Sequence, residues 1–399
     1  MQLARSHPRA HAHTSARAKR LLIVGPKPPP IGGSPLTVQA MLEELAFYPS
    51  VEIRLISTSP ALDVRKKMTG FNFEKVKRTI LILPRFIYEL PRCDAALVFA
   101  NDLFAITLAP ILLLFAKLFR KPFYLKPVGA GLDLFINAQK KVLRAYLMFA
   151  LRSMDGILTQ TQLLKDDLQK MGLVKVEYLP GCRPLAPVTE TPAKHRDEFR
   201  LIYLGHITRR KGILYLLEAL GILSQTYPQK VTCDFFGPIH DELRDEFDAG
   251  LQSQPNARYC GVAEAGTGPQ LIANYDALVL PTYFDTEGHP GVLIEAMHAG
   301  VPIIGTQVRT FPELIEHGVN GLLVPLQDSV SLANAIETLA ENPDLHKKMA
   351  EANHQKGREF RADTVVEKML QIVFPDVQWK KDPKGFSCEP GSVMAENRR

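Results

Sequence analysis

The hydrophobic residues of this chain fall into short runs that are separated by longer amphipathic segments. Short runs rich in β-branched residues are typical of buried strands, whereas apolar residues that recur every three or four positions are typical of helices. The alternation of the two patterns starts at Arg20 and starts again at Phe199. The predicted strands are 20–25, 51–57, 95–100, 123–125, 156–159, 175–179, 199–205, 231–237, 277–281, 303–306 and 321–324, and the predicted helices are 37–47, 165–171, 213–224, 291–299, 331–341 and 362–374.

A segment rich in proline and charge, Pro180–Glu198, separates the two halves and has the composition of a linker. Strand–helix alternation favours parallel sheets that are covered by helices, with ligands at the carboxyl ends of the strands. We therefore predict an α/β protein in which two Rossmann-like, doubly wound domains face a central cleft. The predicted parts are a basic tail at 1–20, a first domain at 21–185, a second domain at 186–360, and a terminal helix with a loose tail at 361–399.

Composition narrows the function classes. The 399 residues are enough for two domains, and the net charge of +6 is mild and dispersed. Such a balance argues against nucleic acid as a partner, although it suits an anionic ligand or an anionic membrane surface. The five cysteines are scattered without metal-type spacing, and the first residues do not form a signal peptide, so a cytoplasmic protein is expected.

The longest apolar run is Leu103–Phe119. A membrane-spanning helix needs about 20 apolar residues, so this run favours a buried or interfacial helix over a span. The basic pair Arg120 and Lys121 follows it, which leaves open a peripheral association with the inner face of a membrane.

The segment Pro281–Gly300, PTYFDTEGHPGVLIEAMHAG, carries the strongest chemical signal. Pro290 fits the first turn of a helix, and the following glycine and valine then expose backbone N–H groups at the helix N-terminus, which is an anion site. Glu287 lies just before this helix and Glu295 lies one turn inside it. A single glutamate is usually a solvated surface acid, but this spacing favours two carboxylates at one pocket.

The E-x7-E spacing within EGHPGVLIE, followed by AMHAGVPIIG, resembles the donor-site signature of family-4 retaining glycosyltransferases of the GT-B fold. The stretch Phe311–Pro325 is also similar to that family. The resemblance implies that Glu287 contacts the donor sugar and that Glu295 holds the ribose hydroxyls. It further implies an acceptor-binding first domain, a nucleotide-sugar-binding second domain, and donor contacts from Gly288, His289, Pro290, Gly291 and Val292.

The basic loop GHITRRKG follows a predicted strand and precedes a helix. An ordinary basic loop is one interpretation. In the resembled family a Gly-Arg and a later Lys-Gly place two cations on the diphosphate, and Lys211 fits the second of these. His206 stands where the arginine usually stands, and a neutral histidine is a weaker phosphate partner. Arg209 or Arg210 is expected to replace it, and we include Arg210 among the donor-binding residues.

Two glycine-containing segments of the first half complete the predicted site. Gly32 and Gly33 allow close approach of the backbone to a ligand, although a simple strand-to-helix turn has the same sequence. They resemble the family's glycine loop beneath the donor phosphates and near the acceptor, so we include them among the donor-binding residues. After the strand at 123–125, many relatives carry a histidine at the donor sugar. Here Lys126, Gly129 and Gly131 occupy that region, so we assign no catalytic histidine.

These features predict a retaining glycosyltransferase that moves a sugar from a nucleotide-sugar, with UDP favoured, to a hydroxyl of a glycan or lipid-linked acceptor in cell-surface polysaccharide or glycan assembly. Glu287 and Lys211 are the predicted catalytic residues. No metal and no cofactor are expected, and the chain contains no D-x-D triplet. The open alternatives are a nucleotide-sugar epimerase of the same fold and a catalytically degenerate nucleotide-sugar binding protein.

Overall fold

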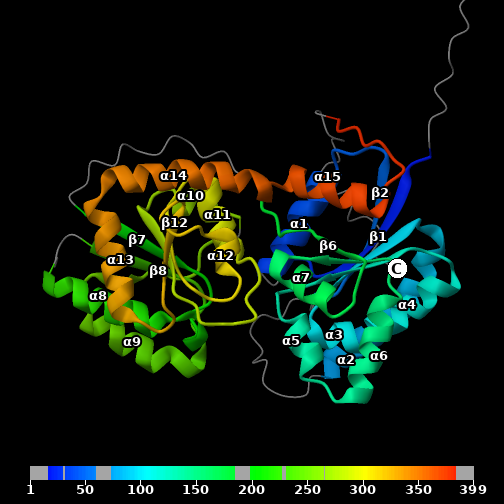
Figure 1. Cartoon of the computed structure of the whole chain (residues 1–399), viewed down its shortest axis with the longest axis horizontal. Helices are drawn as coiled ribbons and strands as arrows, with labels where there is room; N and C mark the ends of the chain where they lie inside the picture. Colours follow the sequence, from blue (N-terminus) through cyan, green and yellow to red (C-terminus); the bar gives the residue numbers. More distant parts are fainter. Residues whose placement is uncertain are drawn as a thin grey trace, which may run out of the picture.

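The computed structural model describes residues 17–29, 32–59, 73–184, 198–226, 231–264 and 266–382. It consists of two domains, each built on a six-stranded sheet whose paired strands are all parallel (Figure 1). Most of the predicted basic tail and of the predicted linker, together with the end of the C-terminal tail, lies outside the described residues.

The first sheet has the strand order β2-β1-β3-β4-β5-β6. Its central strand β3 has the sequence AALVFA and is buried along its whole length, as expected for a parallel strand with helices on both faces. The strands are β1 (Lys19–Gly25), β2 (Val51–Ser57), β3 (Ala95–Ala100), β4 (Phe123–Pro127), β5 (Gly156–Thr159) and β6 (Val176–Tyr178).

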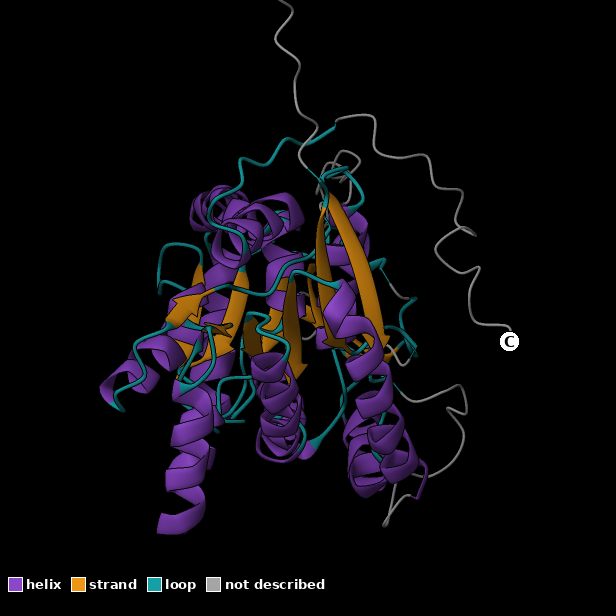
Figure 2. Ribbon diagram, turned by 90° about the vertical axis from the view of Figure 1, so that its right-hand side faces the viewer, coloured by secondary structure: helices purple, strands orange, loops and turns teal. Residues whose placement is uncertain are grey.

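Helices cover both faces of this sheet (Figure 2). One face packs against α1 (Gly33–Leu45) and α15 (Ala362–Val373). The opposite face packs against the helices that connect the strands, which are α2 (Phe73–Glu89), α3 (Asp102–Thr107), α4 (Ala109–Leu118), α5 (Leu132–Asn137), α6 (Lys141–Arg152) and α7 (Gln162–Lys170).

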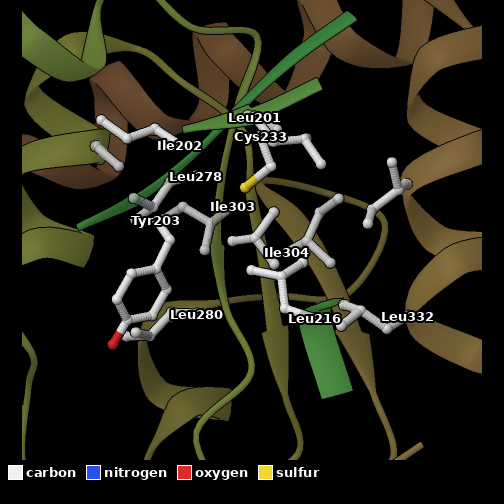
Figure 3. Close-up of a cluster of buried hydrophobic side chains, with 14 of the residues drawn as sticks. Leu201, Ile202, Tyr203, Leu216, Cys233, Leu278, Leu280, Ile303, Ile304 and Leu332 are labelled. Atoms are coloured by element: carbon white, nitrogen blue, oxygen red, sulfur yellow. The ribbon is translucent and has the colours of Figure 1, made fainter. Parts of the chain in front are cut away.

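The second sheet has the strand order β12-β11-β10-β7-β8-β9. Figure 3 shows its core, in which Leu201, Leu278 and Ile303 come from three adjacent strands and are fully buried. The strands are β7 (Phe199–Leu204), β8 (Val231–Phe236), β9 (Ala257–Tyr259), β10 (Ala277–Leu280), β11 (Ile303–Thr306) and β12 (Gly321–Val324). The helices are α8 (Ile213–Thr226), α9 (Arg244–Ser253), α10 (Gly268–Ile272), α11 (Gly291–Ala299), α12 (Phe311–Leu314), α13 (Ser329–Glu341) and α14 (Pro343–Gly357).

After α14 the chain returns to the first domain, where α15 packs along α1 (Figure 1). Val366 and Met369 of α15 are buried against Leu21 and Ile23 of β1. At the crossing point the backbone N–H of Arg183 donates to the carbonyl of Phe360 at 3.2 Å. The last helix in the described part of the chain, α15, therefore completes the first domain.

The predicted α/β architecture with two doubly wound parallel sheets is confirmed. The apolar run Leu103–Phe119 forms the two short helices α3 and α4. Within the described ranges, no helix combines the length and the apolar character that crossing a membrane requires. The predicted boundary between the first and second domains, at residues 185 and 186, falls within the undescribed residues 185–197. The exact domain limits therefore remain a prediction.

Candidate functional site

A cavity of ≈ 920 Å³ lies between the two domains. Its walls come from the carboxyl ends of strands in both sheets, which is where α/β domains bind ligands. In the first domain, the cavity is lined by Gly32 and Gly33 at the start of α1, by Lys126 on β4, and by Gly129 and Gly131 after β4. In the second domain, the segments after β7, β8 and β10 supply Gly205, His206, Lys211, Gly237, Pro238, Glu287 and Gly288. The volume suits an extended, largely enclosed small molecule.

Lys211 and Glu287 form an ion pair in this cavity, with Lys211 Nζ 2.5 Å from Glu287 Oε2. Lys211 ends a short 3-10 turn after β7, and Gly212 follows it with a φ of 75°. A Cβ atom at Gly212 would lie 1.9 Å from the carbonyl oxygen of Pro281, so only glycine allows the two loops to approach this closely. The glycine therefore places the lysine beside the loop that carries Glu287.

The N-terminus of α11 forms another part of the wall. Pro290 is its N-cap residue, with an extended backbone and no side-chain hydrogen bond to the cap. Pro290, Gly291 and Val292 all line the cavity, so the backbone N–H groups of the first turn lie beside its interior. Such a helix end favours an anion through its unpaired N–H groups and its dipole.

Arg183 also lies at this helix end. Its Nε donates to Glu295 Oε1 at 2.9 Å, and its Nη1 donates to Thr37 Oγ1 at 2.8 Å. A Cβ atom at Gly291 would lie 1.6 Å from Arg183 Nη2, so the glycine makes room for the guanidinium. Arg183 was not among the predicted site residues, because Pro180–Glu198 was expected to be a linker. The available signal was a lone arginine five residues after the end of β6 at Tyr178.

The pair of Arg183 and Glu295 is largely withdrawn from solvent, with side-chain exposures of 6% and 13%. Burial raises the pKa of Glu295, while the charge of Arg183 and the hydrogen bond from it oppose that rise. Glu295 is also close to α10, because a Cβ atom at Gly268 would lie 2.1 Å from its Oε2. The predicted contact of Glu295 with a ribose remains a prediction.

The basic residues of the loop after β7 that were predicted to contact the donor do not all line the cavity. His206 lines the cavity, and burial together with the charges of His240 and Lys211 lowers its pKa, which keeps it neutral near pH 7. Arg210 is not among the lining residues, because its guanidinium lies over the ring of Phe284. Arg209 pairs with Glu246 at the surface. Arg183, rather than either of these two arginines, is the arginine that lines the cavity.

His289 lines the cavity at its wall, but its imidazole is fully buried. The ring packs edge-on against Tyr178 and Phe360, and its Nε2 lies 3.2 Å from Glu313 Oε2. Burial lowers the pKa of His289. The ring thus belongs to the contact between the domains, and the predicted contact of His289 with a donor remains a prediction.

The first domain approaches the same loop through its glycines. Gly129 has a φ of 89°, and a Cβ atom at Gly131 would lie 2.7 Å from Thr286 Cγ2. Lys126, on the strand before them, is fully buried and donates to the carbonyl of Leu179 at 2.5 Å. Burial lowers the pKa of this lysine to about 7. Lys126 thus contributes a buried amine at the cavity wall.

Two further contacts hold the domains together beside the cavity. Arg309 of the second domain donates to Asp133 and to Asp167 of the first domain, each at 2.6 Å. Glu313 accepts hydrogen bonds from the backbone N–H groups of Gln162 and Leu163, both at 2.7 Å, at the start of α7. These polar contacts keep the two cavity walls together.

Comparisons with known proteins agree with this arrangement. Residues 198–342 match the family described as glycosyl transferases group 1. An exopolysaccharide phosphotransferase of Streptomyces coelicolor is 38% identical over 149 residues, which are 37% of this chain and 15% of that protein. The alpha-D-kanosaminyltransferase of Streptomyces kanamyceticus is 26% identical over 214 residues, which are 52% of this chain and 54% of that protein. The chain thus spans about half or less of the length of these curated relatives.

The fold has a solved counterpart over nearly the whole chain. The crystal structure of Anabaena HepE in complex with UDP superposes with a TM-score of 0.66 at 18% identity, covering 88% of this chain and 98% of that one. At this identity the similarity concerns the fold, which is the GT-B fold predicted from the sequence.

Proposed function

We propose that this protein is a retaining glycosyltransferase that uses a nucleotide-sugar donor, because residues 198–342 match the group 1 glycosyl transferases and the chain has the GT-B fold. The observation that carries the proposal is the Lys211–Glu287 ion pair in the cavity that the N-terminus of α11 also lines. UDP is the favoured nucleotide, since the solved structure of HepE contains UDP.

The donor diphosphate is proposed to lie against the first turn of α11 and the ammonium group of Lys211. The bond between the anomeric carbon and the phosphate oxygen breaks, and negative charge grows on the departing diphosphate. Lys211 and the backbone N–H groups of Gly291 and Val292 act where that charge develops, which is where fixed electrostatic groups contribute most. These groups provide the charge stabilisation without a divalent ion in this proposal.

Glu287 is proposed to position the donor sugar. Its carboxylate accepts hydrogen bonds from sugar hydroxyls once the diphosphate attracts Lys211, and it stabilises positive charge on an oxocarbenium-like ring. The acceptor hydroxyl attacks the anomeric carbon from the side of the leaving group. Its proton then passes to the departing phosphate oxygen, so that no protein base is required and the configuration is retained.

The acceptor is proposed to be a glycan or a lipid-linked glycan in cell-surface polysaccharide assembly on the cytoplasmic side of a membrane. The exopolysaccharide relative from Streptomyces coelicolor supports the polysaccharide context. The first domain supplies the acceptor side of the cavity through Gly32, Gly33 and the loop after β4.

A thermal-shift screen against UDP-, GDP- and ADP-sugars tests the donor assignment. The expected result is a rise in Tm with UDP-sugars that the Lys211→Ala variant loses. A chain that responds to none of these donors contradicts the proposal. Incubation with the stabilising donor alone then separates the chemistries, because an epimerase forms a new nucleotide-sugar without an acceptor and a transferase does not.

A further inference from the structure

The outer surface of the helix layer on the first domain is unusually apolar. Of the sixteen large hydrophobic side chains that are exposed in the described residues, ten belong to α2, α3, α4, α5 and α6. Figure 1 shows these helices gathered on the side of the first sheet opposite α1 and α15. The ten residues are Leu81, Tyr88, Leu103, Ile111, Leu114, Leu118, Leu134, Val142, Tyr146 and Phe149.

The exposed apolar residues follow helical spacing, so that they form outward stripes in addition to the inward stripes that build the core. On α4 the outward stripe is Ile111, Leu114 and Leu118, and the last two are 66% and 71% exposed. On α6 it is Val142, Tyr146 and Phe149. A surface helix of a soluble domain normally carries polar residues on its outer face. A contiguous apolar surface indicates an interaction site.

The exposed charged residues of the stretch 81–152, which carries these stripes, are all positive. Between residues 81 and 152, none of the four acidic residues is exposed, since Asp133 is buried and Glu89, Asp94 and Asp102 are half-buried. The exposed cations of the same stretch are Arg85, Arg92, Lys117, Arg120, Lys140, Lys141, Arg144 and Arg152. Lys117 pairs with Asp155, which lies just beyond the stretch.

We propose that this surface, defined by the ten apolar residues and eight cations above, docks the protein on an anionic lipid bilayer. Apolar side chains on an outer helix face, surrounded by lysine and arginine, match the acyl boundary and the anionic headgroups of a membrane interface. A second copy of the same surface would bring eight cations against eight cations, which opposes self-association. The charge pattern therefore favours docking on an anionic bilayer over formation of a dimer through this surface.

The position of the surface relates it to the cleft. Leu134 on α5 is one of the ten apolar residues, and α5 begins at Leu132, directly after the cavity-lining Gly131. A lipid-linked acceptor held at the bilayer would therefore be delivered beside the first-domain wall of the cavity. This last link rests on the proposed function, whereas the docking surface does not.

Flotation of the full-length chain with phospholipid vesicles tests the inference without any donor or acceptor. The chain is expected to float with vesicles of phosphatidylcholine mixed with phosphatidylglycerol, to release at high salt, and to bind pure phosphatidylcholine weakly. A chain that stays in solution with the mixed vesicles overturns the proposal.

A matched pair of valines separates this surface from general stickiness. Val142 on α6 is 84% exposed, and Val174, outside the surface but on the same domain, is 86% exposed. Val142→Asp and Phe149→Asp are each expected to weaken vesicle binding about tenfold or more. Val174→Asp is expected to bind as the unchanged chain does. Equal losses from Val142→Asp and Val174→Asp contradict the assignment.

The contribution of the surface cations to vesicle binding is tested with a second matched pair of variants. The double variant Lys141→Glu with Arg144→Glu is expected to lose anionic-vesicle binding about thirtyfold or more, since each surface cation contributes measurably to binding. Lys347→Glu with Lys348→Glu makes the same charge change on exposed positions of α14 and is expected to retain binding. Unchanged Tm values show that each variant is folded.

Analytical ultracentrifugation completes the test. If the chain is a dimer and Val142→Asp converts it to a monomer, this surface binds a second copy of the chain. That result overturns the proposal that the surface docks on a bilayer. The UDP-sugar thermal shift of the vesicle-binding variants is expected to match that of the unchanged chain. Failure of vesicle binding with an intact donor response therefore counts against the docking surface alone.

Discussion

Arg183 and Glu295 form a buried ion pair across 112 residues of sequence, with Nε and Oε1 2.9 Å apart. Arg183 follows the last strand of the first domain, and Glu295 lies in the first turns of α11 in the second domain. The pair therefore joins the two domains at the wall of the cavity.

Loss of either partner is expected to destabilise the fold, because it leaves a buried charge without its counterion. Arg183→Met and Glu295→Leu are each expected to lower the free energy of unfolding by about 3–5 kcal/mol, and the double variant by less than the sum. Urea unfolding measures all three. Arg209→Met is the control, since Arg209 pairs with Glu246 at the surface and its loss should change the free energy of unfolding little. Strictly additive losses in the double variant contradict a direct pair.

Lys211→Ala is expected to reduce turnover about a hundredfold or more with little change in the fold, because it removes a cation from the position where leaving-group charge develops. Glycosyl transfer from the identified donor is the measurement. Arg209→Ala is the matched control, since it removes a neighbouring cation whose guanidinium pairs with Glu246 at the surface. A folded Lys211→Ala chain with full turnover excludes the lysine from the mechanism.

The buried Lys126 predicts a pH dependence of stability. Its pKa falls from 10.5 in the unfolded chain to about 7 in the folded one, so the unfolded state binds more protons between these values. The free energy of unfolding should therefore rise with pH from about 7 to about 10.5 through this group. In Lys126→Met that rise should be smaller, as urea unfolding across this pH range would measure. An identical slope in the variant and the unchanged chain argues that the amine is not buried in its neutral form.

Arg309→Ala is expected to loosen the contact between the domains, since it leaves the carboxylates of Asp133 and Asp167 without their shared guanidinium. The Asp133 side chain is only 6% exposed, so the loss should cost about 2 kcal/mol or more. Small-angle scattering should report a larger radius of gyration. Lys170→Ala removes an exposed partner of Asp167 and should leave the radius unchanged. If the radius of gyration of the Arg309→Ala chain is unchanged, the other contacts between the domains are enough to hold them together.

Gly212→Ala tests the close approach of the two loops. Gly318 has a similar φ of 82° with no neighbour within 4 Å of an added Cβ atom, so Gly318→Ala should cost only the backbone strain of about 1–2 kcal/mol. Gly212→Ala adds a clash with Pro281 and should cost clearly more, together with a loss of turnover as Lys211 moves. Thermal unfolding of the two variants compares them directly, and equal losses would argue against the steric account.

Local pattern was enough to predict elements that are buried along most or all of their length. Gly291–Ala299, Ile303–Thr306 and Gly321–Val324 have the limits expected from sequence. Lys141–Arg152 was not among the predicted helices, although its apolar residues recur at helical spacing and Val142 and Phe149 lie on its outer face. The apolar residues of α3 and α4 made Leu103–Phe119 look like one long run.

The contacts between the domains could not be predicted, because each joins residues that are distant in sequence. Nothing near Arg183 indicates that it meets Glu295, and nothing near His289 indicates that its ring packs on Phe360. Glu287 and Lys211, which the motifs singled out, both line one cavity because both follow strand ends of a single domain, and their catalytic roles stay predictions. Which arginine lines that cavity depends on how the two domains pack against each other, and local sequence does not show this.

The return of α15 to the first domain has a consequence for synthesis on the ribosome. The face of the first sheet that α15 covers includes Leu21 and Ile23, near the beginning of the chain, and it stays partly uncovered until residues 362–373 have emerged. The first domain made is therefore the last to be completed, and closing it requires contacts of very large sequence separation, which form slowly. A nascent chain stalled before residue 362 should bind chaperones through that uncovered face, even when its second domain has already folded.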